Sequence, residues 1–122
     1  MSTSASPEEA APTTFHLTSA SWWEAADPSL DYVPEPFERE GFIHCTDGEA
    51  NLVATANRYY REVRGAFVAL EIDRAVVRAP ILYEDAARIY PHVYGSLNRD
   101  AVLRVRAVQR AADGSFLAVS RD

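Results

Sequence analysis

The sequence predicts an α+β domain of about six strands with two short helices packed on them. Two observations indicate this class. Most of the apolar residues fall in short segments that alternate or are continuously apolar, as strands do, and only two segments have the spacing of a helix. The length of 122 residues suits one domain with a single core.

The first half of the chain opens with a polar stretch and then a strand. Residues 1–12 are rich in Ser, Ala, Pro and Glu without periodicity, which predicts a disordered tail before one domain over residues 13–122. Residues 13–18 (TTFHLT) are typical of a strand. Ser19 is a candidate N-cap for a short helix that carries Trp22 and Trp23. We expect one tryptophan to cover the core and the other to line a groove or an interface.

Residues 41–46 (GFIHCT) predict a second strand that runs into the best helix of the chain, residues 49–62. Strand alternation places Phe42, His44 and Thr46 on one face and Cys45 on the other. Thr46 and Glu49 have the spacing of a capping box, so Thr46 is the expected N-cap. A glycine at position 65 is the expected C-cap of the same helix.

The second half of the chain is mostly β-structure. Residues 66–72 (AFVALEI) are apolar on both faces and predict a central strand, whereas a strand over residues 75–83 is interrupted by a proline. Residues 92–95 form a short extended piece. In residues 101–108 the alternation predicts that Leu103 and Val105 face the core and that Arg104 and Arg106 face solvent. Asp-Gly at positions 113–114 predicts a hairpin turn before a last strand, residues 116–119.

Charge and composition exclude several classes of function. The net charge is −6 and the isoelectric point is near 5.0, which disfavours binding of free nucleic acid. Residues 1–50 carry −9, whereas residues 51–122 carry eleven arginines and eight acids, so an arginine patch in the second half could still hold a phosphate group. No apolar run has the length of a membrane span, and no signal peptide is visible. With a single cysteine, these features predict a cytoplasmic protein that is a monomer or a weak dimer.

The sequence disfavours two kinds of catalytic site, a zinc site and a cysteine nucleophile. His16, His44 and His92 are separated by 28 and 48 residues, without the close ligand pairs of a zinc site, so no metal is expected. Cys45 lies near a helix N-terminus, where a thiol becomes more nucleophilic. However, alternation turns it away from His44, and a buried free cysteine commonly serves only as a small apolar side chain.

The remaining candidates form a polar set that suits a ligand with sugar hydroxyls and aromatic rings. An imidazole can hydrogen-bond a ribose, a phenol ring can stack on a base, and a carboxylate can stabilise a cation or activate a nucleophile. For each residue the alternative is an ordinary structural role, such as a hydrogen-bonded core histidine or a solvated carboxylate at a strand end. The set consists of His16, His44, Thr46, Glu84, His92 and Tyr94.

These residues lie within strings that resemble a known bacterial family. FHLT near the start, EGFIHCT at residues 40–46, PHVYG at residues 91–95 and DGSF at residues 113–116 occur in the order and separation of the uncharacterised DUF952 family. The resemblance covers roughly residues 14–117. It implies an ADP-ribosyltransferase-like fold, a split antiparallel β-sandwich with short flanking helices and a cleft for NAD between two sheets.

The resemblance also implies roles for the candidate residues. His16 or His44 would hydrogen-bond a ribose of NAD, His44 or Tyr94 would pack on the nicotinamide, and Glu84 is the nominee for the carboxylate that assists transfer. The chain lacks the Glu-x-Glu or Gln-x-Glu pair of toxin-like members, so His92 is an alternative for that third role.

Three functions follow as hypotheses. The first is binding of a nucleotide such as NAD or ADP-ribose, with or without ADP-ribosyl transfer, and it requires the side chains of His44 and His92 to lie within about 12 Å, the span of one small ligand. The second is a non-catalytic module that binds a ligand or a protein. The third is a small hydrolase or isomerase with His44 as general base, which needs a carboxylate or hydroxyl to orient the imidazole.

Overall fold

The computed structural model describes residues 12–121. The predicted tail, residues 1–12, lies outside the described residues except for Pro12. The carbonyl oxygen of Pro12 accepts hydrogen bonds from the main-chain N–H of Arg74 at 3.0 Å and from its Nε at 3.2 Å. These bonds fix the chain at the start of the first strand.

Four strands form one antiparallel sheet in the order β1-β3-β6-β7. Their bounds are β1 Thr13–Ser19, β3 Phe67–Asp73, β6 Val102–Arg110 and β7 Phe116–Val119. The central position predicted for residues 66–72 is confirmed, because β3 pairs with β1 on one side and β6 on the other. The predicted hairpin is confirmed as well, since β6 and β7 are paired neighbours.

Three shorter strands form a second antiparallel sheet in the order β2-β5-β4. They are β2 Ile43–His44, β5 Pro91–Val93 and β4 Ile81–Tyr83. The strand predicted over residues 75–83 is therefore only its last three residues and begins after Pro80, which has no N–H to donate to a sheet. An isolated bridge between Phe15 and Thr46 links the two sheets.

Helix α2 (Ala20–Ala25) and helix α4 (Glu49–Tyr59) correspond to the two predicted helices. The predicted cap of α2 is confirmed, because Ser19 Oγ accepts a hydrogen bond from the N–H of Trp22 at 3.1 Å. Both predicted caps of α4 are wrong, because the N-cap is Gly48 and the C-cap is Tyr60, so the helix ends at Tyr59 and not at residue 62. The N–H and the carbonyl of Thr46 are instead hydrogen-bonded to Phe15 across the bridge, so the chain is still extended there.

Two further helical turns are short. Helix α3 (Phe37–Glu40) lies in the segment rich in prolines, and the 3-10 helix η1 (Arg99–Ala101) precedes β6. Both lie in connections between strands.

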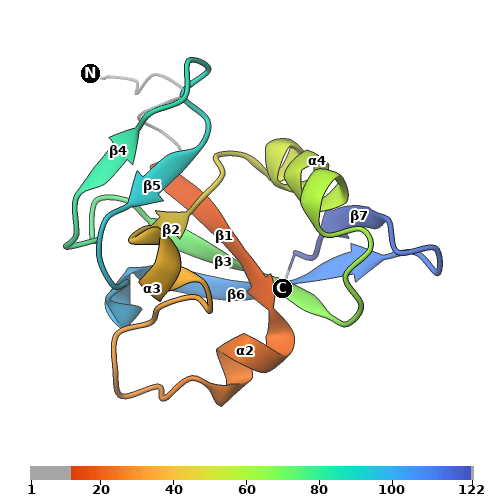
Figure 1. Cartoon of the computed structure of the whole chain (residues 1–122), viewed down its shortest axis with the longest axis horizontal. Coiled ribbons are helices and arrows are strands. Elements are labelled where there is room, and N and C mark those ends of the chain that lie inside the picture. Colours follow the sequence, from red (N-terminus) through yellow and green to blue (C-terminus); the bar gives the residue numbers. More distant parts are fainter. Residues whose placement is uncertain (1–11, 122) are drawn as a thin grey trace.

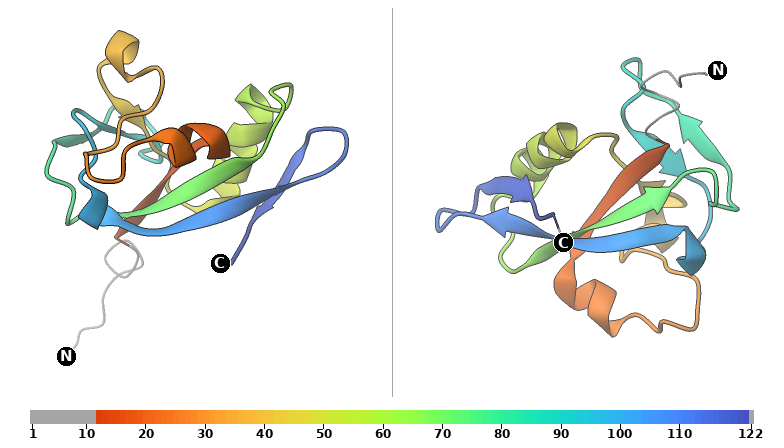
Figure 2. Two further views of the ribbon diagram at one scale, coloured as in Figure 1. Left: turned by 90° about the horizontal axis from the view of Figure 1, so that it is seen from below. Right: turned by 180° about the vertical axis from the view of Figure 1, so that it is seen from behind.

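Two apolar clusters pack on the opposite faces of the four-stranded sheet. Helix α4 covers one face, where Phe15, Leu52 and Phe67 are buried together with side chains of β7. The three-stranded sheet and the loop that carries Tyr32 cover the other face, over Leu70. Figures 1 and 2 show β1 running between α4 on one side and strands β2, β5 and β4 on the other.

The orientation predicted for β6 is wrong for Arg106, Leu103 and Val105, whereas Arg104 is exposed as predicted. Arg106 is buried, at 7% exposure, whereas Leu103 and Val105 are 50% and 38% exposed. The reason is electrostatic and not hydrophobic: the guanidinium of Arg106 pairs with Glu71 at 3.1 Å and with Glu49 at 3.0 Å on the α4 side of the sheet. A β-bulge beside Glu71 also shifts the register of β6 along β3.

The chain thus folds as a mixed α/β protein with a curled antiparallel sheet and short helices (Figure 1). Within residues 12–121, none of the helices has the length and apolar character needed to cross a membrane.

Candidate functional site

Two of the predicted site residues lie directly opposite each other in the three-stranded sheet. The register of β2 and β5 pairs His44 with His92, so both side chains leave the same face. Their ring centroids are 5.2 Å apart with an interplanar angle of 80°. One small ligand can contact both rings only if they lie within about 12 Å of each other, and this condition is met.

Phe42 and Tyr94 extend this pair into a continuous aromatic cluster. The ring of Phe42 stacks on His92 with a centroid distance of 4.1 Å and lies 4.7 Å from the ring of His44. Tyr94 lies 5.3 Å from Phe42 and 6.3 Å from His92. These four side chains are called the histidine cluster below. Alternation along the two strands, which the sequence already showed, places them on one face.

Glu84 holds two members of the cluster. His92 Nδ1 lies 3.0 Å from Glu84 Oε1, and the Tyr94 hydroxyl donates to the same oxygen. The hydrogen bond from Tyr94, followed by that from His92, lowers the pKa of the Glu84 carboxyl. The same bond raises the pKa of the Tyr94 phenol. Glu84 therefore stays ionised and orients both rings.

Glu40 holds His44, and sequence analysis did not identify it as a site residue. The Nε2 of His44 lies 3.1 Å from Glu40 Oε1. Gly41 brings the two side chains together, because its left-handed φ of 79° turns the chain from the end of α3 directly into β2. The sequence signal that could have identified Glu40 is its position only four residues before His44. Glu40 supplies the orienting carboxylate that a general base at position 44 would need.

His16 lies behind His44 and is buried. Its Nδ1 is 2.7 Å from the main-chain carbonyl oxygen of His44, which can only accept, so Nδ1 carries the proton. The remaining Nε2 faces the hydroxyl of Tyr32 at 3.4 Å. Burial lowers the pKa of His16 to about 4, against a smaller upward effect of the hydrogen bond to the His44 carbonyl. His16 is thus a neutral hydrogen-bonding group at neutral pH.

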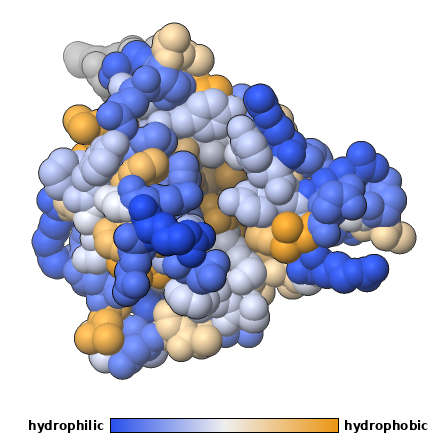
Figure 3. All heavy atoms as spheres, viewed as in Figure 1, coloured by the Kyte–Doolittle hydropathy of each residue, from blue (hydrophilic) through white to orange (hydrophobic). Residues whose placement is uncertain are grey.

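A cleft of about 700 Å³ opens beside these residues, between β1 of the larger sheet and β2 of the smaller one. Figure 3 shows the surface hollowed at this place, between the part that carries α3 and the part that carries α4. His16, His44 and Thr46 line the cleft, whereas Glu84, His92 and Tyr94 do not. His44 therefore joins the cleft to the histidine cluster.

The walls of the cleft include residues that sequence analysis had not assigned to the site. Aromatic surface comes from Trp22 and Tyr60, positive charge comes from Arg39, and negative charge comes from Glu35 and Glu40. Trp22 is 37% exposed, and its indole N–H donates to the carbonyl of Val33 at 3.0 Å, which fixes the ring. The expectation for the tryptophan pair is confirmed, because Trp23 packs against the core while Trp22 lines this groove.

Cys45 is excluded as a nucleophile by its position. The side chain is 2% exposed and belongs to the core cluster between the sheets. Burial, with a smaller effect of Asp47, raises the pKa of the thiol far above its usual range. The described part of the chain also contains no group of three or more His, Cys, Asp or Glu side chains arranged to hold a metal ion.

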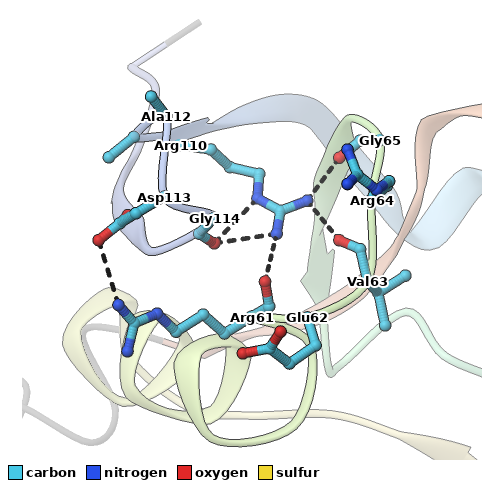
Figure 4. Close-up of a pocket in the computed structure, with 10 residues that line it drawn as sticks. Arg61, Glu62, Val63, Arg64, Gly65, Arg110, Ala112, Asp113 and Gly114 are labelled. Atoms are coloured by element: carbon cyan, nitrogen blue, oxygen red, sulfur yellow. Dashed lines mark hydrogen bonds and ion pairs between the residues drawn. The ribbon is translucent and has the colours of Figure 1, made fainter.

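A smaller hollow of about 350 Å³ between residues 61–65 and 110–114 carries arginines that are already engaged. Figure 4 shows the guanidinium of Arg110 bonded to carbonyl oxygens of the surrounding loops, among them Val63 and Gly65 at 2.7 Å each. Arg61 pairs with Asp113 at 3.1 Å. These bonds tie the β6–β7 hairpin to the end of α4, so this hollow is a structural junction.

The chain is thus a small mixed α/β protein with two antiparallel sheets and a cleft lined by two histidines. The chain belongs to the family described as protein of unknown function (DUF952), whose model matches residues 17–105. The family expected from the sequence is therefore confirmed. No curated protein matches the chain.

Solved structures of one bacterial protein share the fold. The crystal structure of protein CC0527 from Caulobacter crescentus has a TM-score of 0.72 at 22% identity, covering 86% of this chain and 93% of that one. The solution structure of CC0527 gives a TM-score of 0.66 at the same 22% identity, with coverage of 90% and 92%. At this identity the likeness concerns the fold alone.

Proposed function

We propose that the chain binds a nucleotide of the NAD or ADP-ribose type in the cleft between its two sheets. The observation that carries this proposal is the position of His44, which lines the cleft and also belongs to the histidine cluster. A volume of about 700 Å³ falls within the range of small-molecule sites. The resemblance to the ADP-ribosyltransferase-like fold supports the proposal, because it implies a cleft for NAD between two sheets.

The lining of the cleft suits such a ligand. The rings of Trp22 and Tyr60, each 37% exposed, offer faces on which a base can stack. Arg39 offers a positive charge to a diphosphate, and Thr46, which is 5% exposed, adds a hydroxyl group to the lining. His16 supports the floor through its bond to the carbonyl of His44.

The histidine cluster could add proton transfer to binding. His44 is oriented by Glu40 and His92 by Glu84, and each imidazole keeps a second ring nitrogen for a reacting group. Transfer chemistry within the cleft would place His44 as the general base and Glu40 as its orienting group. His92, Glu84 and Tyr94 do not line the cleft and would act through the contact of His92 with His44.

One observation favours the alternative of binding without transfer. Glu84, the carboxylate nominated for transfer, is outside the cleft lining and is engaged by His92 and Tyr94. Glu84→Gln separates the two functions: a large loss of turnover at unchanged ligand affinity favours the enzyme, and unchanged activity excludes that role for Glu84.

A thermal-shift titration tests the binding proposal. Wild type, His44→Ala and the control Arg58→Ala are titrated with NAD, ADP-ribose and pyrophosphate; Arg58 is at the exposed end of α4 against Tyr59 and outside the cleft. A ligand that binds only the folded state at 100 times its Kd adds about 2.7 kcal/mol of stability.

We expect NAD or ADP-ribose to stabilise wild type and Arg58→Ala, and His44→Ala to lose most of the shift. Equal shifts in all three proteins would place the ligand elsewhere, and no shift with either nucleotide would contradict the proposal. A shift with pyrophosphate that His44→Ala retains would report an anion site outside the cleft.

A further inference from the structure

A second hollow, of about 880 Å³, lies at the start of α4 and contains four arginines. It shares no lining residue with the cleft. All four come from the arginine-rich second half of the chain, and they are Arg74, Arg88, Arg104 and Arg106. We propose that this hollow, called the arginine pocket below, is a binding site for a phosphate group, with Arg88 and Arg104 as the residues that contact it.

Arg88 is held in place by its backbone. It is the one residue other than glycine with a positive φ, 56°, among those described. The turn that holds it is fixed by Asp85, whose main-chain carbonyl accepts from the N–H of Arg88 and whose carboxylate accepts from Ile89 and Tyr90. A left-handed conformation is unfavourable for a side chain of this kind, which makes the position a candidate for function.

The side chain of Arg88 keeps its hydrogen-bond donors available. Its guanidinium lies over the ring of Tyr83 at 5.0 Å, a contact that uses the ring face. Tyr83 is itself fixed, because its hydroxyl accepts from Arg74 and donates to Asp47, each at 2.6 Å. Among the described residues, no carboxylate forms an ion pair with Arg88. The guanidinium is therefore oriented but not neutralised.

Arg104 contributes from the sheet. One of its nitrogens lies 3.3 Å from Glu71 Oε2, and its side chain is 58% exposed, so further donors face solvent. Arg106 is fully engaged and serves as structure, since it binds Glu71, Glu49 and the carbonyl of Ser120.

The acids of the arginine pocket are matched except at one atom, because Asp47 Oδ1 is buried without a hydrogen-bond partner. Both carboxylate oxygens of Glu71 face arginines, Glu49 pairs with Arg106, and one oxygen of Asp47 accepts from Tyr83. The N-cap of α4, Gly48, has no side chain to occupy the first N–H groups of this 11-residue helix. These groups add to the attraction for an anion that the guanidiniums create.

Phosphate is the ligand class that fits these donors best. A guanidinium presents parallel N–H groups that match two oxygens of a phosphate, and two guanidiniums can share one dianion. A monocarboxylate offers half the charge and fewer oxygens. We therefore expect inorganic phosphate to bind and acetate to bind much more weakly.

The test is a titration of the whole chain with sodium phosphate against sodium chloride and sodium acetate at matched ionic strength, followed by thermal shift and by isothermal calorimetry. Arg88→Gly is the informative variant, because glycine accepts the φ of 56° without strain and removes the guanidinium. Arg104→Ala tests the second contact, and Arg58→Ala is the control.

We expect phosphate to raise the melting temperature of wild type and Arg58→Ala. Arg88→Gly should melt at least as high as wild type without phosphate and yet bind phosphate at least tenfold more weakly, as should Arg104→Ala. An unchanged phosphate affinity in both Arg88→Gly and Arg104→Ala, or an equal response to acetate, would overturn the proposal.

The site is independent of the proposed nucleotide cleft, and His44→Ala separates the two. This variant should keep the full response to phosphate even if it loses the response to NAD. Loss of the phosphate response in His44→Ala with retention in Arg88→Gly would assign the anion to the cleft and contradict the arginine pocket.

Discussion

The buried ring of His16 donates a hydrogen bond of 2.7 Å to the main-chain carbonyl of His44. This bond crosses from the edge strand β1 of the larger sheet to β2 of the smaller sheet. It lies at the base of the cleft, next to the Phe15–Thr46 bridge. His44 has the more exposed of the two imidazoles in the histidine cluster. Its backbone is thus positioned by His16, which is shielded from solvent.

The stability of the fold should depend on pH through His16. Burial lowers its folded-state pKa to about 4, from 6.5. Between these values the unfolded chain binds more protons, so stability is complete above pH 6.5 and falls as the pH falls toward 4. From pH 7 to pH 5 this one group should remove about 2 kcal/mol from the free energy of unfolding.

His16→Asn, which keeps a side-chain donor but does not titrate, isolates this contribution from that of the carboxylates. Urea denaturation at pH 7 and pH 5 should show the difference between wild type and variant shrinking by about 2 kcal/mol at the lower pH. A difference that is the same at both pH values would mean that His16 does not titrate as inferred.

The buried pair of Arg106 and Glu71 should matter for stability more than any exposed pair. Their side chains are 8% and 10% exposed. Removal of the guanidinium by Arg106→Met leaves the Glu71 carboxylate without its main partner, which should cost about 3 kcal/mol in urea denaturation. The double variant Arg106→Met, Glu71→Leu should recover part of this loss, and Arg104→Met, whose side chain is 58% exposed, should cost less than about 1 kcal/mol. Equal losses in the two single variants would contradict the role of burial.

Much of the candidate site followed from the sequence because it depends on local alternation. Period-two spacing placed Phe42 and His44 on one face, and the short extended piece placed His92 and Tyr94 together. The pairing of these two strands belongs to the tertiary structure and does not follow from alternation. Both segments, however, lie in sequence motifs that occur in a specific order in the family. Glu84 was nominated as a carboxylate, and the structure shows that it contacts His92 and Tyr94.

The parts that the sequence did not predict depend on partners distant along the chain or on local turns. Alternation cannot say which face of β6 is covered, and an arginine is expected outside unless its acidic partners are known. Arg106 is buried because Glu71 and Glu49 meet it from two other elements. Glu40 was overlooked for a local reason, since a turn at Gly41 places it beside His44.

The thiol of Cys45 should be unreactive in the folded protein. It is 2% exposed, and burial raises its pKa, so very little thiolate forms and reagents cannot reach it. A disulfide reagent such as dithionitrobenzoate should give no colour with the native protein over an hour and one equivalent of thiol in guanidinium chloride. Reaction within minutes at pH 8 would show that the core between the two sheets opens readily.

The turn at Gly114 should tolerate a side chain less well than the turn at Gly41. Both have a left-handed φ, +94° and +79°, so replacement by alanine costs about 1 kcal/mol at either position from backbone strain alone. At Gly114 a Cβ would also lie 2.5 Å from the carbonyl oxygen of Arg61, whereas at Gly41 nothing lies within 4 Å.

Because Arg110 ties this turn to the end of α4, the backbone has little freedom to relax (Figure 4). Urea denaturation should therefore show Gly114→Ala to be less stable than Gly41→Ala by a further 1–3 kcal/mol, roughly the range for overpacking. Equal losses for the two variants would mean that the hairpin moves away from the helix at small cost, and that the junction formed by Arg110 is weaker than its hydrogen bonds indicate.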